Sequence, residues 1–105
     1  MKTLVAVPHH EYPNEVRTIV ETKAQSLLRY YERILSLRAV LLREHDLHKV
    51  ELVAHVGRGA TLVVAAQGDL FESALEEALA RMGRVLRRHK TRLTERNRRG
   101  GRIGH

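Results

Sequence analysis

The side chains with the clearest chemical potential form a row of arginines near the C-terminus. Arg81, Arg84, Arg88 and Arg92 follow one another at steps of three and four residues. At about 100° per residue, a helix places these four side chains within a sector of about 80°. A guanidinium group is planar, always charged and suited to phosphate oxygens. This arginine row therefore predicts contact with a phosphate backbone, a contact that carries no sequence information.

The net charge of +7 is concentrated at the same end of the chain. Residues 81–105 hold ten lysines and arginines against Glu95 alone, whereas residues 1–80 hold nine basic and eleven acidic side chains. Such a block predicts a polyanionic partner, with nucleic acid as the first hypothesis. The alternative is a solvated basic segment without a specific partner. We expect Arg87 and Lys90 to flank the arginine row on the side away from the apolar stripe of the helix.

Signals for catalysis and for metal binding are missing from the sequence. The 105 residues include no cysteine, which excludes disulfides and thiolate chemistry. The turn at Gly57–Gly59 lacks the third glycine and the following helix of a phosphate loop. His45 and His48 share one turn, but a metal site needs three or four converging ligands. We expect no catalytic residue, metal, cofactor, small-molecule substrate or membrane span.

The first third of the chain predicts a strand followed by a helix. Residues 3–7 are strand-like and end at Pro8, and a helix opens at Pro13–Glu15. Tyr30 and Tyr31 are adjacent, so one is expected in the core and the other at the surface or stacked on a base. An apolar stripe at helical spacing runs through Val16, Ile19, Val20, Ala24, Leu27, Tyr31 and Ile34.

The centre and the C-terminal part predict three strands and a second helix. Residues 36–44 are apolar, residues 50–56 alternate with a period of two, and residues 60–67 follow a glycine turn. Asp69 is a candidate N-cap with Glu72 three residues later. His55 is expected to face outward and His89 to pack at the edge of the core. The buried stripe of the second helix comprises Phe71, Ala74, Leu75, Ala78, Leu79, Met82, Leu86, His89 and Leu93.

This order predicts an α+β fold, β-α-β-β-β-α, with a four-stranded sheet and two helices packed on one face. Residues 1–95 are expected to form a single domain. The segment 96–105 is rich in glycine and arginine, cannot bury a core and is expected to be a flexible basic tail.

Three segments, read in this order, resemble the ribosome hibernation-promoting factors, also called ribosome-associated inhibitor or sigma-modulation proteins. The likeness covers roughly residues 3–93. In the first helix it rests on Val20–Lys23, Leu27 and Tyr30–Ile34, and at the second helix on Gly68–Leu75 and Leu86–Leu93. The chain departs from the family in the loop Pro8–Pro13, which replaces a glycine-rich basic loop, and in using arginine where the family often has lysine.

The resemblance implies a cytoplasmic, non-enzymatic protein that binds small-subunit rRNA in the decoding channel and blocks access of mRNA and tRNA. It also implies protection of idle ribosomes under stress. Long family members carry a C-terminal dimerisation domain that we do not expect in this chain, so a homodimer is expected to be possible but not required. The residues expected to bind RNA are Lys23, Arg29, Arg33, Arg81, Arg84, Arg87, Arg88, Lys90 and Arg92.

Two other functions stay open at this point. An exposed strand edge could pair with a protein partner or a second copy, which would make the chain a protein-interaction or regulatory module. The basic segment could also bind nucleic acid without specificity.

Overall fold

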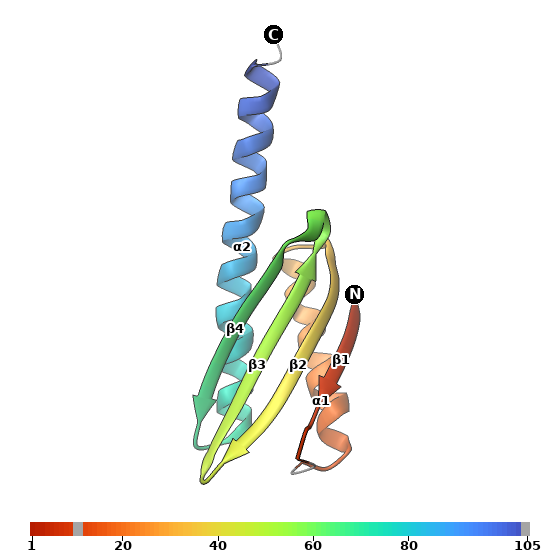
Figure 1. Ribbon diagram of the computed structural model, residues 1–105, viewed down its shortest axis with the longest axis vertical. Coiled ribbons are helices and arrows are strands. Elements are labelled where there is room, and N and C mark those ends of the chain that lie inside the picture. The colour runs from red at the N-terminus through yellow and green to blue at the C-terminus, as the bar shows by residue number, and fades with distance from the viewer. Residues whose placement is uncertain (10–11, 104–105) are drawn as a thin grey trace.

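The computed structural model describes residues 1–9 and 12–103, and their side chains up to residue 96 (Figure 1). Strand β1 (Lys2–Ala6) leads into helix α1 (Glu15–Ala24) and a short 3₁₀ helix η1 (Gln25–Arg29). Strands β2 (Ile34–Glu44), β3 (Leu47–Val56) and β4 (Thr61–Gly68) follow, with a 3₁₀ turn η2 (Gly57–Gly59) before β4. Helix α2 (Phe71–Ile103) ends the fold. Both helices cover one face of the sheet, so the predicted β-α-β-β-β-α architecture is confirmed.

The four strands form one sheet in the order β1-β2-β3-β4. Neighbours among β2, β3 and β4 are antiparallel, as expected for strands joined by short turns. Strand β1 pairs in parallel with β2, with Val5 opposite Ala39. A parallel pair needs a long crossover connection, and α1 provides it. The sheet is therefore mixed.

The core lies between the sheet and the helices. The predicted alternation in β3 is confirmed, since Val50, Leu52, Ala54 and Val56 are all buried. Their partners from α2 include Leu75, Met82 and Leu86, each fully buried. Burying a side chain of this size contributes about 1.5–3 kcal/mol. The apolar stripe thus fixes which side of α2 faces the sheet, and leaves the other side to solvent.

The first helix is shorter than its apolar stripe predicts. Helix α1 ends at Ala24 and η1 at Arg29, so Ile34 belongs to β2 and not to the helix. Leu27, Tyr31 and Ile34 are nevertheless all buried in the same core. A helix, a turn and a strand that enter one core in succession can imitate a single helical period. The prediction of a continuous helical stripe to Ile34 was therefore wrong.

The second helix begins later and ends later than expected. Its first residue is Phe71, and the carbonyl of Leu70 accepts a hydrogen bond from the amide of Ala74 at 3.1 Å. Leu70 is thus the residue at the cap position, one place after Asp69, which corrects the predicted N-cap. The backbone is helical to Ile103, beyond the sheet that supports the first half of α2 (Figure 1). That 96–105 is a flexible tail stays a prediction; its last two residues lie outside the described chain.

Each outer strand of the sheet accepts a hydrogen bond from an arginine of the neighbouring helix. Arg17 of α1 donates from Nη1 to the carbonyl of Val5 in β1 at 2.8 Å. Arg81 of α2 donates from Nη1 to the carbonyl of Ala65 in β4 at 2.5 Å. Each contact uses one of the two lone pairs of a single carbonyl, so it does not by itself prevent an added strand from pairing. A module that pairs through a sheet edge therefore stays an alternative.

The two helical segments are in close contact at Gly83 of α2. A Cβ atom at this position would lie 2.9 Å from Cε2 and 3.1 Å from Cζ of Tyr30. Real Cβ atoms essentially never approach another heavy atom so closely. Tyr31 is the buried member of the tyrosine pair, and Tyr30 is half-buried against α2. The absence of a side chain at residue 83 is therefore what admits the Tyr30 ring.

This contact predicts non-additive stabilities. In a Tyr30→Ala background, Gly83→Ala should stabilise the protein by up to about 1 kcal/mol, because alanine is the better helix former. In the presence of Tyr30 the same change should be neutral or destabilising, since overpacking costs about 1–3 kcal/mol. Urea unfolding of the four proteins gives the coupling free energy, expected at about 1–2 kcal/mol. A coupling near zero would mean that the ring does not occupy this position.

No helix in the part of the chain that the structure describes combines the length and the apolar character needed to span a bilayer.

Candidate nucleic-acid interface

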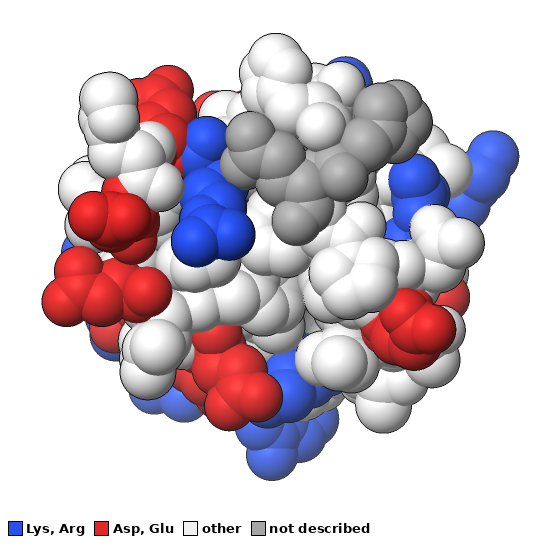
Figure 2. Space-filling model, turned by 90° about the horizontal axis from the view of Figure 1, so that it is seen from below, with Lys and Arg blue, Asp and Glu red and all other residues white. Residues whose placement is uncertain are grey.

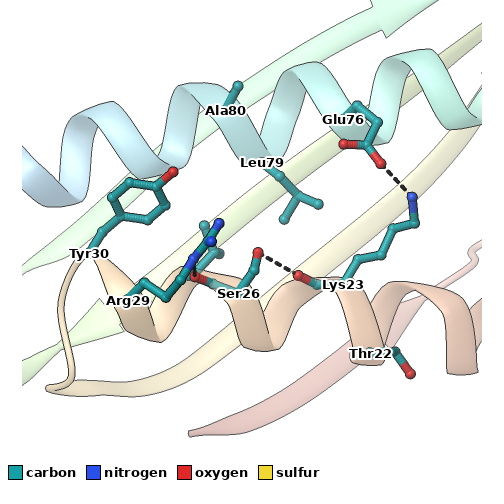
Figure 3. A pocket seen from close by; sticks show the side chains of 9 residues that line it. Thr22, Lys23, Ser26, Arg29, Tyr30, Glu76, Leu79 and Ala80 are labelled. Atoms are coloured by element: carbon teal, nitrogen blue, oxygen red, sulfur yellow. Dashed lines mark hydrogen bonds and ion pairs between the residues drawn. The ribbon is translucent and has the colours of Figure 1, made fainter.

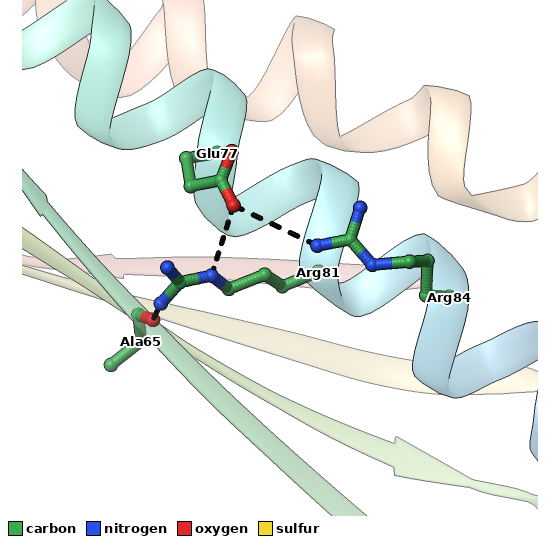
Figure 4. A network of polar contacts seen from close by, with 4 residues as sticks. All are labelled: Ala65, Glu77, Arg81 and Arg84. Carbon is green, nitrogen blue, oxygen red and sulfur yellow. Dashed lines mark hydrogen bonds and ion pairs between the residues drawn. The ribbon is translucent and has the colours of Figure 1, made fainter.

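The four members of the arginine row are all exposed on the solvent side of α2. One carboxylate, Glu77, engages the first two of them (Figure 4). Its Oε1 lies 3.0 Å from Nε of Arg81 and 3.7 Å from Nη2 of Arg84. Exposed pairs of this kind contribute only about 0.2–1 kcal/mol. A stronger anion such as a phosphate can therefore compete for these guanidinium groups.

Beyond Arg84 the row forms no ion pair within the described part of the chain. Arg88 and Arg92 are exposed and form no ion pair with any residue that the structure describes. Glu95 stands one turn further along α2, but no ion pair joins it to Arg92. The distal half of the row thus presents cations without a neutralising partner on the described protein surface.

A groove between α1, η1 and α2 brings a second group of cations together (Figure 3). Its volume is about 420 Å³, and Lys23, Arg29 and Tyr30 line one side. The guanidinium carbons of Arg29 and Arg87 lie 5.7 and 5.4 Å from the centre of the Tyr30 ring, within the range of cation–π attraction. Tyr30 therefore organises one cation from η1 and one from α2 at the same place.

Lys23 is paired across this groove with Glu76 of α2 (Figure 3). The hydrogen bond to Glu76, and then the charge of the same carboxylate, hold the pKa of Lys23 above its ordinary value of 10.5. Both side chains are largely exposed, at 41% for Lys23 and 60% for Glu76. This pair links the helices and occupies a lysine that the sequence assigns to RNA binding.

Lys90 does not lie where the sequence predicts. It is exposed, but it lines a different hollow together with Arg33 and Arg58. The helical spacing explains this, because Lys90 is about 180° around the axis from Arg81 and close to the apolar stripe. Arg87 does lie away from the stripe, toward Tyr30. The nine predicted residues thus form three groups rather than one continuous patch.

Charge is distributed unevenly along the molecule. The end opposite to the C-terminus carries patches of both signs (Figure 2). On α2 the acidic residues Glu72, Glu76 and Glu77 come first and the arginines follow. The helix dipole favours this order, since it attracts anions at the N-terminal end and cations at the C-terminal end. The basic surface therefore increases along α2 with distance from its start.

His48, His55 and His89 each contact a neighbouring side chain of the fold. Nδ1 of His48 lies 2.5 Å from the hydroxyl of Tyr12, and both rings pack near Phe71. His89 is half-buried, with its ring 5.4 Å from that of Tyr31, as expected for the edge of the core. His55 is exposed, as predicted, and contacts Thr61 at 3.1 Å. Among the described residues there is no cluster of three or more histidine, aspartate or glutamate ligands for a metal.

The fold is shared with solved structures of other proteins. One is the N-terminal domain of Protein Y from Thermus thermophilus, with a TM-score of 0.73 and 22% identity over 85% of this chain and 99% of that one. Another is described as a ribosomal subunit interface protein from Coxiella burnetii, with a TM-score of 0.79 and 13% identity over 87% and 99%. At these identities the likeness concerns the fold alone.

Sequence comparison goes further and shows the family. Residues 5–94 match the family described as Sigma 54 modulation protein / S30EA ribosomal protein. The ribosome hibernation promoting factor of Salmonella typhimurium is 31% identical over 85 residues, 81% of this chain and 88% of that protein. The factor of the same name from Azotobacter vinelandii is 31% identical over 81 residues, 77% and 75%. The chain belongs to this family of hibernation factors, which are not enzymes.

The Lys23–Glu76 pair generates a titration prediction. Following the Nζ group of Lys23 by NMR should give a pKa above 10.5, and Glu76→Gln should lower that pKa. Because the folded-state pKa is raised, the stability from this pair is present below pH 10.5 and is lost as the pH rises through the folded value. Glu51→Gln on the open face of the sheet is the control. An unchanged Lys23 titration in the Glu76 variant would show that the pair does not form.

Proposed function

We propose that this protein is a ribosome hibernation factor that binds rRNA of the small subunit in the decoding channel and blocks mRNA and tRNA. Family membership and the names of its relatives support association with the ribosome, and with it a cytosolic place of action. The single observation that carries the RNA-binding step is the arginine row on the exposed side of α2, in which Arg88 and Arg92 form no ion pair with any described residue. The rest of the proposal follows from what such a surface does.

The mechanism is occupancy and needs no bond-making chemistry. Successive turns of α2 present guanidinium groups at about 5.4 Å intervals along the axis, a spacing at which neighbouring groups can contact different phosphates. Each contact releases condensed counterions, which supplies affinity without reading sequence. Specificity then comes from the shape of the groove that the helix fills. A protein bound there excludes other ligands of the same channel and is released when salt or a competitor displaces it.

The first test removes three cations from the arginine row. Arg84→Ala, Arg88→Ala and Arg92→Ala together should weaken binding to purified small subunits by at least tenfold at moderate salt. The loss of three contacts should also reduce the slope of log K against log salt by about 2–3. The melting temperature should stay close to that of the unmodified chain, because all three side chains are exposed. Co-sedimentation in a density gradient measures the binding.

A matched control removes the same charge elsewhere. Lys2→Ala, Arg38→Ala and Lys49→Ala act on the face of the sheet opposite to the helices, where Leu4 and Val63 are also exposed. This variant should bind nearly as well as the unmodified chain. An equal loss of affinity in both variants would mean that the arginine row acts only through the net charge of the protein. Equal affinity for duplex DNA and for small subunits would favour a nonspecific nucleic-acid binder instead.

A second prediction concerns the carboxylate at the start of the row. Glu77→Gln should tighten binding to small subunits about two- to fivefold, because it frees Arg81 and Arg84 from a pair worth about 0.2–1 kcal/mol. The gain should shrink as salt is raised. Glu51→Gln, on the open sheet face, removes the same charge away from the row and should leave the affinity unchanged. Weaker binding by the Glu77 variant would mean that this carboxylate positions Arg81 productively.

A further inference from the structure

A small hollow lies at one end of the sheet, where three segments distant in sequence meet. It is lined by Arg33 before β2, Arg58 in the turn between β3 and β4, and Lys90 of α2, together with Glu32, Leu93 and Thr94. We call it the turn pocket. Figure 1 shows that the β3–β4 turn and the start of β2 lie at the end of the sheet from which α2 continues. Arg58 is not among the residues that sequence analysis assigns to RNA binding.

The turn pocket concentrates uncompensated positive charge. Its three cations are exposed, and none of them forms an ion pair with a residue in the described part of the chain. Glu32 is the one acidic side chain in the lining, so the charge of the pocket is +2. Like charges held together repel, and an anion seated among them removes the repulsion. The half-buried Leu93 and the ring of Tyr31 provide apolar walls, which strengthen the field in the hollow.

The backbone holds Arg58 in a conformation that arginine rarely adopts. Its φ is 70°, in the left-handed region that favours glycine, although glycines stand on both sides of it. The turn is anchored by the amide of Gly57, which donates to the carbonyl of Arg33 at 3.0 Å. The backbones of two of the three cations are thus fixed relative to each other. A strained, positioned arginine is an observation from which function can be inferred.

We propose that the turn pocket binds one phosphate group, supplied by the backbone of the RNA strand that the protein contacts. The inference rests on the proposed function. The hollow is about 200 Å³, below the roughly 300 Å³ at which pockets for whole small molecules begin. It suits a single phosphate whose sugar and base stay outside. Lys90 belongs to the same helix as the arginine row but lies about 180° around its axis from Arg81, so the pocket takes its phosphate from a stretch of the bound RNA other than the one at the row.

The test compares single substitutions in the pocket with one outside it. Arg33→Gln, Arg58→Gln and Lys90→Gln should each weaken binding to small subunits about three- to tenfold. Each should also lower the salt slope by about 0.7–0.9, the value for one phosphate contact. Arg43→Gln, at the opposite end of β2, is the matched control and should change neither quantity. Arg58→Gly should bind as weakly as Arg58→Gln while melting no earlier than the unmodified chain, since glycine accepts a positive φ.

A second measurement distinguishes an RNA phosphate from a free anion. Inorganic phosphate is titrated into the unmodified chain and the Arg58→Gln variant, and the amide resonances of Gly57 and Gly59 are followed. Weak shifts in the unmodified chain alone, together with weakened subunit binding by the variant, support the proposal. If the resonances of the unmodified chain shift but Arg58→Gln binds small subunits normally, the proposal that RNA supplies the phosphate is overturned.

Two results separate the failure of this inference from the failure of the proposed function. If the unmodified chain binds small subunits and Arg58→Gln behaves like Arg43→Gln, the turn pocket is not a phosphate site and the proposed function stands. If the unmodified chain does not bind small subunits at all, the proposed function fails and the RNA source fails with it.

Discussion

The structure depends on how one helix meets two opposing requirements. Helix α2 must bury an apolar side against the sheet, yet it carries a growing excess of positive charge along its length. Cations on successive turns repel one another, so burial has to hold the helix in place. Leu75, Met82 and Leu86 provide that anchor at the sheet. The exposed side is then free to carry charge without any cost to the core.

Contacts between α1, η1 and α2 bring cations from different elements together on one surface. Tyr30 packs on Gly83 and is approached by Arg29 and Arg87, so cations from two elements converge beside one ring. The carboxylates at the start of α2 take up part of the charge within the free protein, through Glu76 and Glu77. On α2, the described cations beyond Arg84 form no such ion pair. This polarity orients the molecule with respect to a polyanion before any close contact forms.

Local patterns in the sequence predict the elements well because they report what each segment does by itself. The alternation at residues 50–56 and the apolar stripe from Ala74 to Leu86 each describe one face of one element, and both are confirmed. The apolar stripe that runs on to Ile34 gave a wrong prediction of a continuous helix, because a helix, a turn and a strand contribute to it one after another. The parallel pairing of β1 with β2 leaves no local pattern, since it depends on the crossover.

The candidate site could be predicted only in part. A helical projection places Arg81, Arg84, Arg88 and Arg92 together from sequence alone, and the structure places them on the exposed side of α2. A helical projection cannot place Lys90 beside Arg33 and Arg58, because tertiary packing brings these three segments together. Arg58 had one weak signal, a basic residue between two glycines, which indicates a tight turn but no partner. The Lys23–Glu76 pair also depends on tertiary packing, whereas Glu77 and Arg81 stand four residues apart on one helix, a spacing from which their pair could have been predicted.

The most direct measurement is the affinity of the unmodified chain for purified small ribosomal subunits as a function of salt. Five to eight phosphate contacts predict that log K falls linearly with log salt, with a slope of about −4 to −7. Binding of this steepness, lost to competing mRNA and tRNA, is the expected result. An affinity that is flat across the salt range would contradict the account, because the cations of α2 would then not supply the binding energy.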